Sequence, residues 1–214
     1  MSGTEKDHIV FVVDDDYRMR EALHDLLSSA HLNVVAFESA SDYLGFAKPD
    51  LPACLVLDVE LPDINGLDLQ SQLAGEHPPQ IVFLTGHGDI PSSVRALKAG
   101  AVDFLTKPFS EADLLGAINI AIGQDREARL ERAELATLQQ RLATLTPRER
   151  EVLPLVVSGL LNKQAAGELG ISEVTLQIHR GKIMHKMNAD SLADLVRMAG
   201  TLGIPLTHSR RKAE

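Results

Sequence analysis

Five side chains suited to phosphate chemistry stand at the ends of short apolar runs in this sequence. Asp14 and Asp15 follow the first run, and Asp58 ends another. Thr85 and Lys107 close two later runs. Three carboxylates held together would repel one another, and at least one pKa would rise unless a cation is bound. Ligands that are all oxygen atoms suit Mg²⁺, while a hydroxyl and an ammonium group suit phosphoryl oxygens. Together these groups predict a carboxylate nucleophile that accepts a phosphoryl group in line.

The apolar runs that carry these side chains alternate with segments of helical periodicity. Strands are predicted at 9–13, 34–37, 55–58, 81–85 and 102–106. Helices are predicted at 17–29, 41–46, 66–73 and 90–99, with a further helix from residue 110. This alternation implies right-handed crossovers and an α/β doubly wound parallel sheet of five strands. Since such a sheet binds its ligands at the carboxyl ends of its strands, we expect the five side chains to meet there.

Length and charge favour two domains with different tasks. The 214 residues exceed one typical domain and suit two. The net charge of −9 is unevenly distributed, because residues 1–122 carry 19 acidic and 7 basic side chains, whereas 123–214 carry 11 acidic and 14 basic ones. An acidic first half is a poor nucleic-acid binder, and a basic second half is a candidate one.

Several features favour a location in the reducing cytoplasm. No apolar run approaches the length of a membrane span, so we expect no membrane partner. Residues 1–8 are polar and lack the apolar region of a secretory signal. The single cysteine, Cys54, cannot form an internal disulfide and is expected to be a small core residue. The eight histidines have no paired spacing of the kind that zinc sites use.

Four motifs, in order, resemble the signature of the response-regulator receiver domain of two-component signalling. Within residues 8–122 these motifs are Val13-Asp14-Asp15, Leu57-Asp58, Leu84-Thr85-Gly86 and Thr106-Lys107-Pro108-Phe109. The resemblance implies that a sensor histidine kinase phosphorylates Asp58. It also implies that Mg²⁺ is bound by Asp14, Asp15, Asp58 and the backbone carbonyl of Glu60. Thr85 and Lys107 would then bind the phosphoryl oxygens, and Phe104 would be the switch aromatic.

Phosphorylation of such a domain is expected to change one of its surfaces. Movement of Thr85 toward the phosphate would let Phe104 turn inward. That change would remodel the face formed by residues 90–121. We predict that this face forms an isologous homodimer when the protein is phosphorylated.

Beyond residue 122 the sequence becomes charged and helical. Residues 123–143 contain one Gly and no Pro, and leucines recur at spacings of three and four residues. These leucines are Leu135, Leu138, Leu142 and Leu145. Two interpretations remain open, a solvated linker helix that continues from the first domain and a short dimeric coiled coil.

The last part of the chain has the pattern of a helix-turn-helix domain. A capping box with Thr146 and Glu149 begins one helix, and further helices are predicted at 162–169, 174–187 and 191–202. A Gly-containing turn joins the second and third of these helices, so the third would lie in the major groove of DNA. Its predicted core stripe is Val174, Ile178, Ile183 and Met187, and its other face carries Thr175, Gln177, Arg180, Lys182, His185 and Lys186.

Three segments here resemble the LuxR-type four-helix DNA-binding domain. They are LTPREREVL (145–153), NKQAA (162–166) and EVTLQIHR (173–180). With the receiver motifs, the whole chain resembles the NarL/FixJ family of response regulators, of the FixJ and StyR type. The candidate contacts with double-stranded promoter DNA are Thr175, Gln177, Ile178, Arg180, Gly181, Lys182 and Lys186. Gln177 stands where relatives often carry Lys, and Gly181 where they carry a base-contacting Lys or Arg, so the operator sequence is not implied.

The resulting hypothesis is a phosphorylation-switched transcription factor with three parts. These are a receiver domain at 1–122, a helical linker at 123–143 and a helix-turn-helix domain at 144–214. Rival hypotheses fit less well. An aspartate-nucleophile phosphatase would want Asp-x-Asp where this chain has Asp58-Val59-Glu60, and a flavodoxin-like domain would want a hydroxyl- and Gly-rich first loop. A DNA-binding regulator independent of phosphorylation is disfavoured by the intact acidic cluster.

Overall fold

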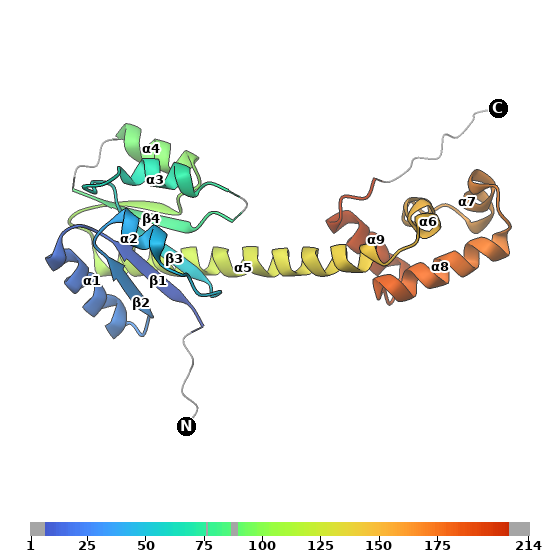
Figure 1. Ribbon diagram of the computed structural model, residues 1–214, viewed down its shortest axis with the longest axis horizontal. Coiled ribbons are helices and arrows are strands. Elements are labelled where there is room, and N and C mark those ends of the chain that lie inside the picture. The colour runs from blue at the N-terminus through green and yellow to red at the C-terminus, as the bar shows by residue number, and fades with distance from the viewer. Residues whose placement is uncertain (1–6, 76, 87–89, 206–214) are drawn as a thin grey trace, which may run out of the picture. The chain divides into compact units, whose positions relative to one another are not determined.

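The computed structural model describes residues 7–75, 77–86 and 90–205. The chain divides into two compact units, Met1–Arg129 and Leu130–Glu214 (Figure 1). One helix, α5 (Glu111–Ala143), contributes residues to both units. Within the described residues, no helix is both long enough and apolar enough to cross a lipid bilayer.

The first unit is built on a parallel sheet of five strands. These strands are β1 (Ile9–Val13), β2 (Val34–Phe37), β3 (Ala53–Asp58), β4 (Gln80–Thr85) and β5 (Asp103–Thr106). Their order in the sheet is β2-β1-β3-β4-β5, and every neighbouring pair is parallel. The predicted doubly wound α/β fold is confirmed. The strand order reverses between β1 and β3, and this reversal opens the edge at which such sheets bind ligands.

Successive residues of each strand point to opposite sides of the sheet, so its apolar residues lie on both faces. Helices cover both of these faces. The helices are α1 (Tyr17–Ser29), α2 (Ala40–Gly45), α3 (Gly66–Leu73), α4 (Ile90–Lys98) and the first part of α5. One buried cluster joins Phe11 and Val13 to α2, α3 and α4. The other joins Val10 and Val12 to α1 and α5. Both faces of the central strands are therefore dry, which explains their unbroken apolar sequence.

The leucines near the end of α5 pack into the core of the second unit. Leu138 and Leu145 are 3% and 4% exposed within the core of the second unit, and Leu142 packs against the same cluster. A solvated linker would leave these side chains in water, and a coiled coil would need them at a surface. The predicted helix that continues from the first domain is present, because α5 runs unbroken from Glu111 to Ala143. At its end the leucines are buried and not solvated, so they fix the end of α5 to the second unit.

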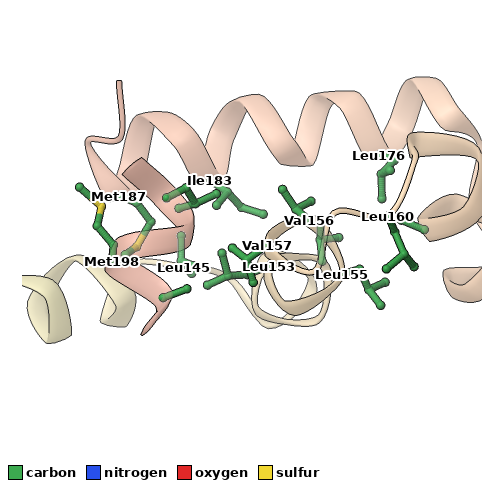
Figure 2. Packing of buried hydrophobic residues seen from close by; sticks show 14 of the residues in the cluster. Leu145, Leu153, Leu155, Val156, Val157, Leu160, Leu176, Ile183, Met187 and Met198 are labelled. Atoms are coloured by element: carbon green, nitrogen blue, oxygen red, sulfur yellow. The ribbon is translucent and has the colours of Figure 1, made fainter. Parts of the chain in front are cut away.

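Within its described residues, the second unit contains four further helices around one apolar core. They are α6 (Pro147–Val157), α7 (Asn162–Leu169), α8 (Glu173–Met187) and α9 (Leu192–Thr201). Figure 2 shows the core between α6, α8 and α9, where Leu153 and Val156 lie beneath the helix that carries Ile183, and Met198 lies beside Met187. The predicted capping box is present, with Thr146 and Glu149 bonding to each other's backbone N–H. The turn between α7 and α8 uses Gly170 with φ +63°, a value that favours glycine.

The predicted core stripe of α8 needs correction. Leu176, Ile183 and Met187 are fully buried, whereas Val174 and Ile178 are 66% and 53% exposed. The reason is helical geometry, since Ile178 and Ile183 are five residues apart and lie on different faces of a helix with 3.6 residues per turn. The predicted stripe combined residues from two opposite faces, and it missed Leu176.

Candidate functional site

The five predicted phosphate-chemistry residues lie at the carboxyl ends of four neighbouring strands of the first unit. Asp14 and Asp15 follow β1, Asp58 ends β3, Thr85 ends β4, and Lys107 follows β5. One ligand oxygen from each of the three aspartates lies within 4.8 Å of the others. Because β1 and β3 are neighbours in the sheet, Asp14 and Asp15 lie beside Asp58, which is more than 40 residues away in the sequence.

Lys107 bridges two of the three carboxylates. Its Nζ atom lies 2.8 Å from Asp14 Oδ2 and 2.5 Å from Asp58 Oδ2. Asp14 Oδ1 accepts a hydrogen bond from the Asp16 N–H, and Asp58 Oδ1 accepts one from the Glu60 N–H, both at 2.9 Å. Each of these two buried carboxylates is therefore held at both oxygens, so its orientation is fixed before any ligand arrives.

Burial and charge act in opposite directions on the titrating groups of this cluster. Burial raises the pKa of the Asp14 carboxyl group, and the hydrogen bond from Lys107 offsets part of the rise. Burial alone would lower the pKa of Lys107, but its bonds to Asp14 and Asp58 outweigh that effect and leave its pKa above the usual value. Burial is the largest single influence on the pKa of both groups, although the Asp14 side chain is 1% exposed and that of Lys107 is 20% exposed.

The donor set fits the metal that the sequence predicted. All three cluster residues offer carboxylate oxygens, which are the ligands that Mg²⁺ prefers. A divalent cation would relieve the repulsion among the carboxylates and the raised pKa of Asp14. Asp14, Asp15 and Asp58 could hold such an ion. The ligand role of the Glu60 backbone carbonyl stays a prediction.

The loop after Asp58 depends on a close backbone approach at Gly66, the first residue of α3. A Cβ atom at this position would lie 2.5 Å from the Asp58 carbonyl oxygen. The Gly66 N–H also donates to the Val59 carbonyl at 2.9 Å. Any larger residue would push α3 away from β3 or turn the peptide that carries Asp58, so this glycine protects the geometry of the cluster.

The two predicted switch residues lie on neighbouring strands. Thr85 is 1% exposed at the end of β4. Phe104, on β5, is partly buried, and its ring centroid lies 5.9 Å from that of Phe83. The strand register sets Thr85 beside Thr106, two residues beyond Phe104. Their roles in a switch stay predictions.

The second predicted site lies on α8, and the structure places its residues in two groups. Gln177, Ile178, Gly181 and Lys182 are exposed. Thr175 and Arg180 are partly buried and bond to neighbours. The Thr175 and Ser172 hydroxyl oxygens are 2.8 Å apart, and Arg180 Nη1 donates to Asn162 Oδ1 at 3.3 Å. The exposed group, with Val174, forms a mixed apolar and polar face on α8.

Lys186, predicted to contact DNA, has partners within the protein, and its role toward DNA stays a prediction. Its Nζ atom lies 2.7 Å from Glu149 Oε2 and donates to the Thr144 carbonyl at 3.1 Å. Glu149 is 2% exposed, and its pKa is lowered chiefly by the hydrogen bond from Lys186. In the sequence, Lys186 resembles an unpaired surface cation. In the fold it pairs with a buried carboxylate and holds α8 against the start of α6.

This pairing predicts a stability effect. Lys186→Met leaves Glu149 buried without its cation, so the free energy of unfolding should fall by about 2 kcal/mol. Lys182→Met removes the same charge from an exposed position and should change stability by less than about 0.5 kcal/mol. Urea unfolding followed by circular dichroism measures both. Equal stability of the two variants would mean that Lys186 is an ordinary surface lysine.

Sequence reasoning missed several residues that the structure connects to these sites. Arg20 donates two hydrogen bonds to backbone carbonyls of the acidic loop. On α4, Ile90, Val94 and Leu97 are 78%, 42% and 47% exposed. Helical spacing would have placed these three on one face, but only the fold shows that this face is left uncovered within the described residues. No sequence motif marks Arg20.

Comparison with known proteins gives two matching families. Residues 10–119 match the family described as response regulator receiver domain, and residues 143–199 match that of bacterial regulatory proteins, luxR family. The chain is 52% identical over 205 residues to Nodulation protein W of Bradyrhizobium diazoefficiens, covering 95% of this chain and 90% of that protein. It is 45% identical over 201 residues to Response regulator protein TodT of Pseudomonas putida, covering 93% and 88%. The solved structure of response regulator StyR has a TM-score of 0.80 with 48% identity, covering 91% of this chain and 98% of StyR.

Proposed function

This chain belongs to the response regulators that join a receiver domain to a LuxR-type DNA-binding domain, and we propose that Asp58 is the residue through which it is switched. Members of this family are regulators of transcription and not enzymes. A sensor histidine kinase would phosphorylate Asp58, the phosphorylated chain would form a homodimer, and the dimer would bind promoter half-sites. The proposed parts are the receiver at 1–122, the linker at 123–143 and the DNA-binding domain at 144–214. Because a regulator of this kind must reach chromosomal DNA, we propose a cytoplasmic location.

One observation supports this function above the others. The Lys107 ammonium lies between the buried carboxylates of Asp14 and Asp58, with Asp15 beside them at the carboxyl edge of the sheet. An ion pair that only stabilised the fold would need a single carboxylate for the Lys107 ammonium group, whereas this site has three. The excess of negative charge makes sense if a divalent cation and a phosphoryl group share the site.

The proposed transfer follows from where each group lies. A carboxylate oxygen of Asp58 attacks the phosphorus in line, and the bond from phosphorus to the donor breaks, so the electron pair leaves with the donor. Lys107 and the Thr85 hydroxyl would then bind the phosphoryl oxygens, Lys107 exchanging a carboxylate partner for one of them. Bound Mg²⁺ would supply positive charge against the oxygens of the transferred group.

The test of this function is phosphate uptake by the whole chain. Incubation with a small acyl-phosphate donor should add one phosphate in the presence of Mg²⁺ and none in the presence of a chelator. Intact-mass spectrometry measures the gain. Labelling that is equal in both conditions would contradict a metal-assisted transfer, and no labelling in Mg²⁺ would contradict the proposed function itself.

A candidate dimer surface lies on α4. Its three exposed apolar side chains stand at spacings of four and three residues, so they form one stripe on the helix. This stripe falls within residues 90–121, the face predicted to change on phosphorylation. An isologous contact would bury it against its own copy.

Val94→Asp is expected to abolish this dimer, because it places a charge in the middle of the apolar stripe. Analytical ultracentrifugation of phosphorylated protein at micromolar concentrations should show a dimer for the unchanged chain and a monomer for Val94→Asp. Leu44→Asp is the matched control, since Leu44 is 47% exposed on α2 and should leave the dimer intact. Identical mass distributions for phosphorylated and unphosphorylated protein would contradict a phosphorylation-dependent dimer.

The DNA-reading proposal rests on the exposed face of α8. Gln177 could pair with adenine through its amide, and Ile178 could contact a thymine methyl group. Lys182 would contact a phosphate. Arg180 remains a proposed phosphate contact, although its bond to Asn162 would have to be exchanged for that role. Gly181 leaves no side chain at its position, so the backbone of α8 could lie close to DNA there. With little positive charge on this face, one domain alone should bind weakly and two half-sites would be needed.

A further inference from the structure

We propose that Arg20 is a positioning residue for the phosphorylation site, and that it does so by fixing the backbone that carries Asp15. Its Nη1 atom donates to the Asp14 carbonyl and to the Asp15 carbonyl, both at 2.8 Å. One nitrogen thus sets the direction of two successive peptide groups. The inference rests on the proposed function, because it assigns a task within the same Mg²⁺ and phosphate site.

The place of Arg20 is electrostatically unfavourable for α1 alone. Arg20 belongs to the first turns of α1, and its side chain turns back toward the carbonyls that precede the helix. A cation at a helix N-terminus opposes the helix dipole, and the Arg20 side chain is only 15% exposed, so water screens it little. Its contact with the exposed Glu38 is 3.7 Å long, which is weak beside the two carbonyl bonds. The Arg20 guanidinium also lies 5.9 Å from the ring centroid of Tyr17, but a cation–π contact with so exposed a ring is weak. The two carbonyl bonds to the acidic loop are therefore the strongest contacts that Arg20 makes.

Asp15 is the carboxylate that needs such support. Asp14 is fixed by the Asp16 N–H and by Lys107, and Asp58 by the Glu60 N–H and by Lys107. Among the residues that the structure describes, no side chain or backbone group bonds to the Asp15 carboxylate, which is exposed. Its position within 4.8 Å of the other two ligand oxygens is therefore set by its backbone. Arg20 holds that backbone on both sides of the residue.

Two physical effects of removing Arg20 have opposite signs, and this makes the proposal testable. Loss of a nearby positive charge would strengthen Mg²⁺ binding through electrostatics alone. Loss of the two carbonyl bonds would let the loop move and would weaken Mg²⁺ binding, as removal of a residue that orients metal ligands commonly does. Whether the affinity for Mg²⁺ rises or falls when Arg20 is replaced therefore shows which effect is larger.

The experiment measures Mg²⁺ binding to the full, unphosphorylated chain by isothermal titration calorimetry. Arg20→Met should raise the Mg²⁺ dissociation constant about tenfold. It should also speed hydrogen exchange of the amides at residues 14–17 in the absence of metal. Arg18→Met is the matched control, because Arg18 is exposed on the same helix turn and carries the same charge. This control should bind Mg²⁺ as the unchanged chain does, or slightly more tightly.

Each outcome has a definite meaning. An Arg20→Met chain that binds Mg²⁺ equally well or more tightly than the unchanged chain overturns the proposal, while the proposed function stands. An unchanged chain that neither binds Mg²⁺ nor takes up phosphate overturns the proposed function. If Arg20→Met does not fold, as judged by circular dichroism, Arg20→Gln replaces it, since glutamine is too short to reach both carbonyls and the same weakening is expected.

Discussion

Asp58→Asn should abolish phosphate incorporation altogether, with no labelled protein above the detection limit of intact-mass spectrometry. The amide of asparagine cannot act as the nucleophile, because its oxygen lacks the charge of a carboxylate. The variant also removes the 2.5 Å ion pair between Asp58 and Lys107, which would otherwise hold the attacking oxygen. The fold should survive, because the change is isosteric and relieves repulsion from the buried Asp14.

Asp16→Asn is the matched control for this result. Asp16 lies close to the cluster in sequence and carries the same charge, but its carboxylate accepts the Arg18 N–H as the N-cap of α1. Asparagine caps helices about as well as aspartate, so structure should be preserved. Asp16→Asn should label like the unchanged chain. Labelling of Asp58→Asn to the same extent would show that another residue accepts the phosphate.

Gln177→Ala should weaken binding to the operator by about 1–3 kcal/mol and relax the preference at one base position. Gln177 is exposed on α8, about 100° around the helix axis from the buried Leu176. A glutamine amide can donate to and accept from adenine in the major groove, and alanine can do neither. Titration of the phosphorylated chain against operator and scrambled duplexes measures the loss.

Lys182→Ala provides the contrasting case, because a phosphate contact carries no sequence information. It should weaken binding to operator and scrambled DNA alike and reduce the salt slope by about one. Titrations at two or more salt concentrations separate the two variants. If Gln177→Ala lowers both affinities equally, Gln177 does not read a base, and the proposed docking of α8 is wrong.

The sequence alone determined the parallel sheet and the acidic cluster. Each strand was visible as an apolar run, and each of Asp14, Asp58, Thr85 and Lys107 stood at the end of its run. In a parallel sheet every strand delivers its carboxyl end to the same edge, so local position in sequence was enough to predict proximity in space. The helix-turn-helix pattern was visible for a similar reason, because capping residues and turn glycines act within a few residues of their own position.

Only the tertiary structure decided which partners the surface-type residues found. The end of α5 was ambiguous in the sequence, because leucines at helical spacing are compatible with a linker helix, a coiled coil or a protein core. The structure shows that Leu138 and Leu145 are buried in the core of the second unit. Lys186 was indistinguishable from Lys182 in sequence until α6 brought the buried Glu149 to it. No sequence motif marks Arg20, because its role depends on the backbone carbonyls that its long side chain reaches and not on its spacing along the chain. Periodicity tells which residues share a face, but what covers that face depends on contacts between segments far apart in sequence.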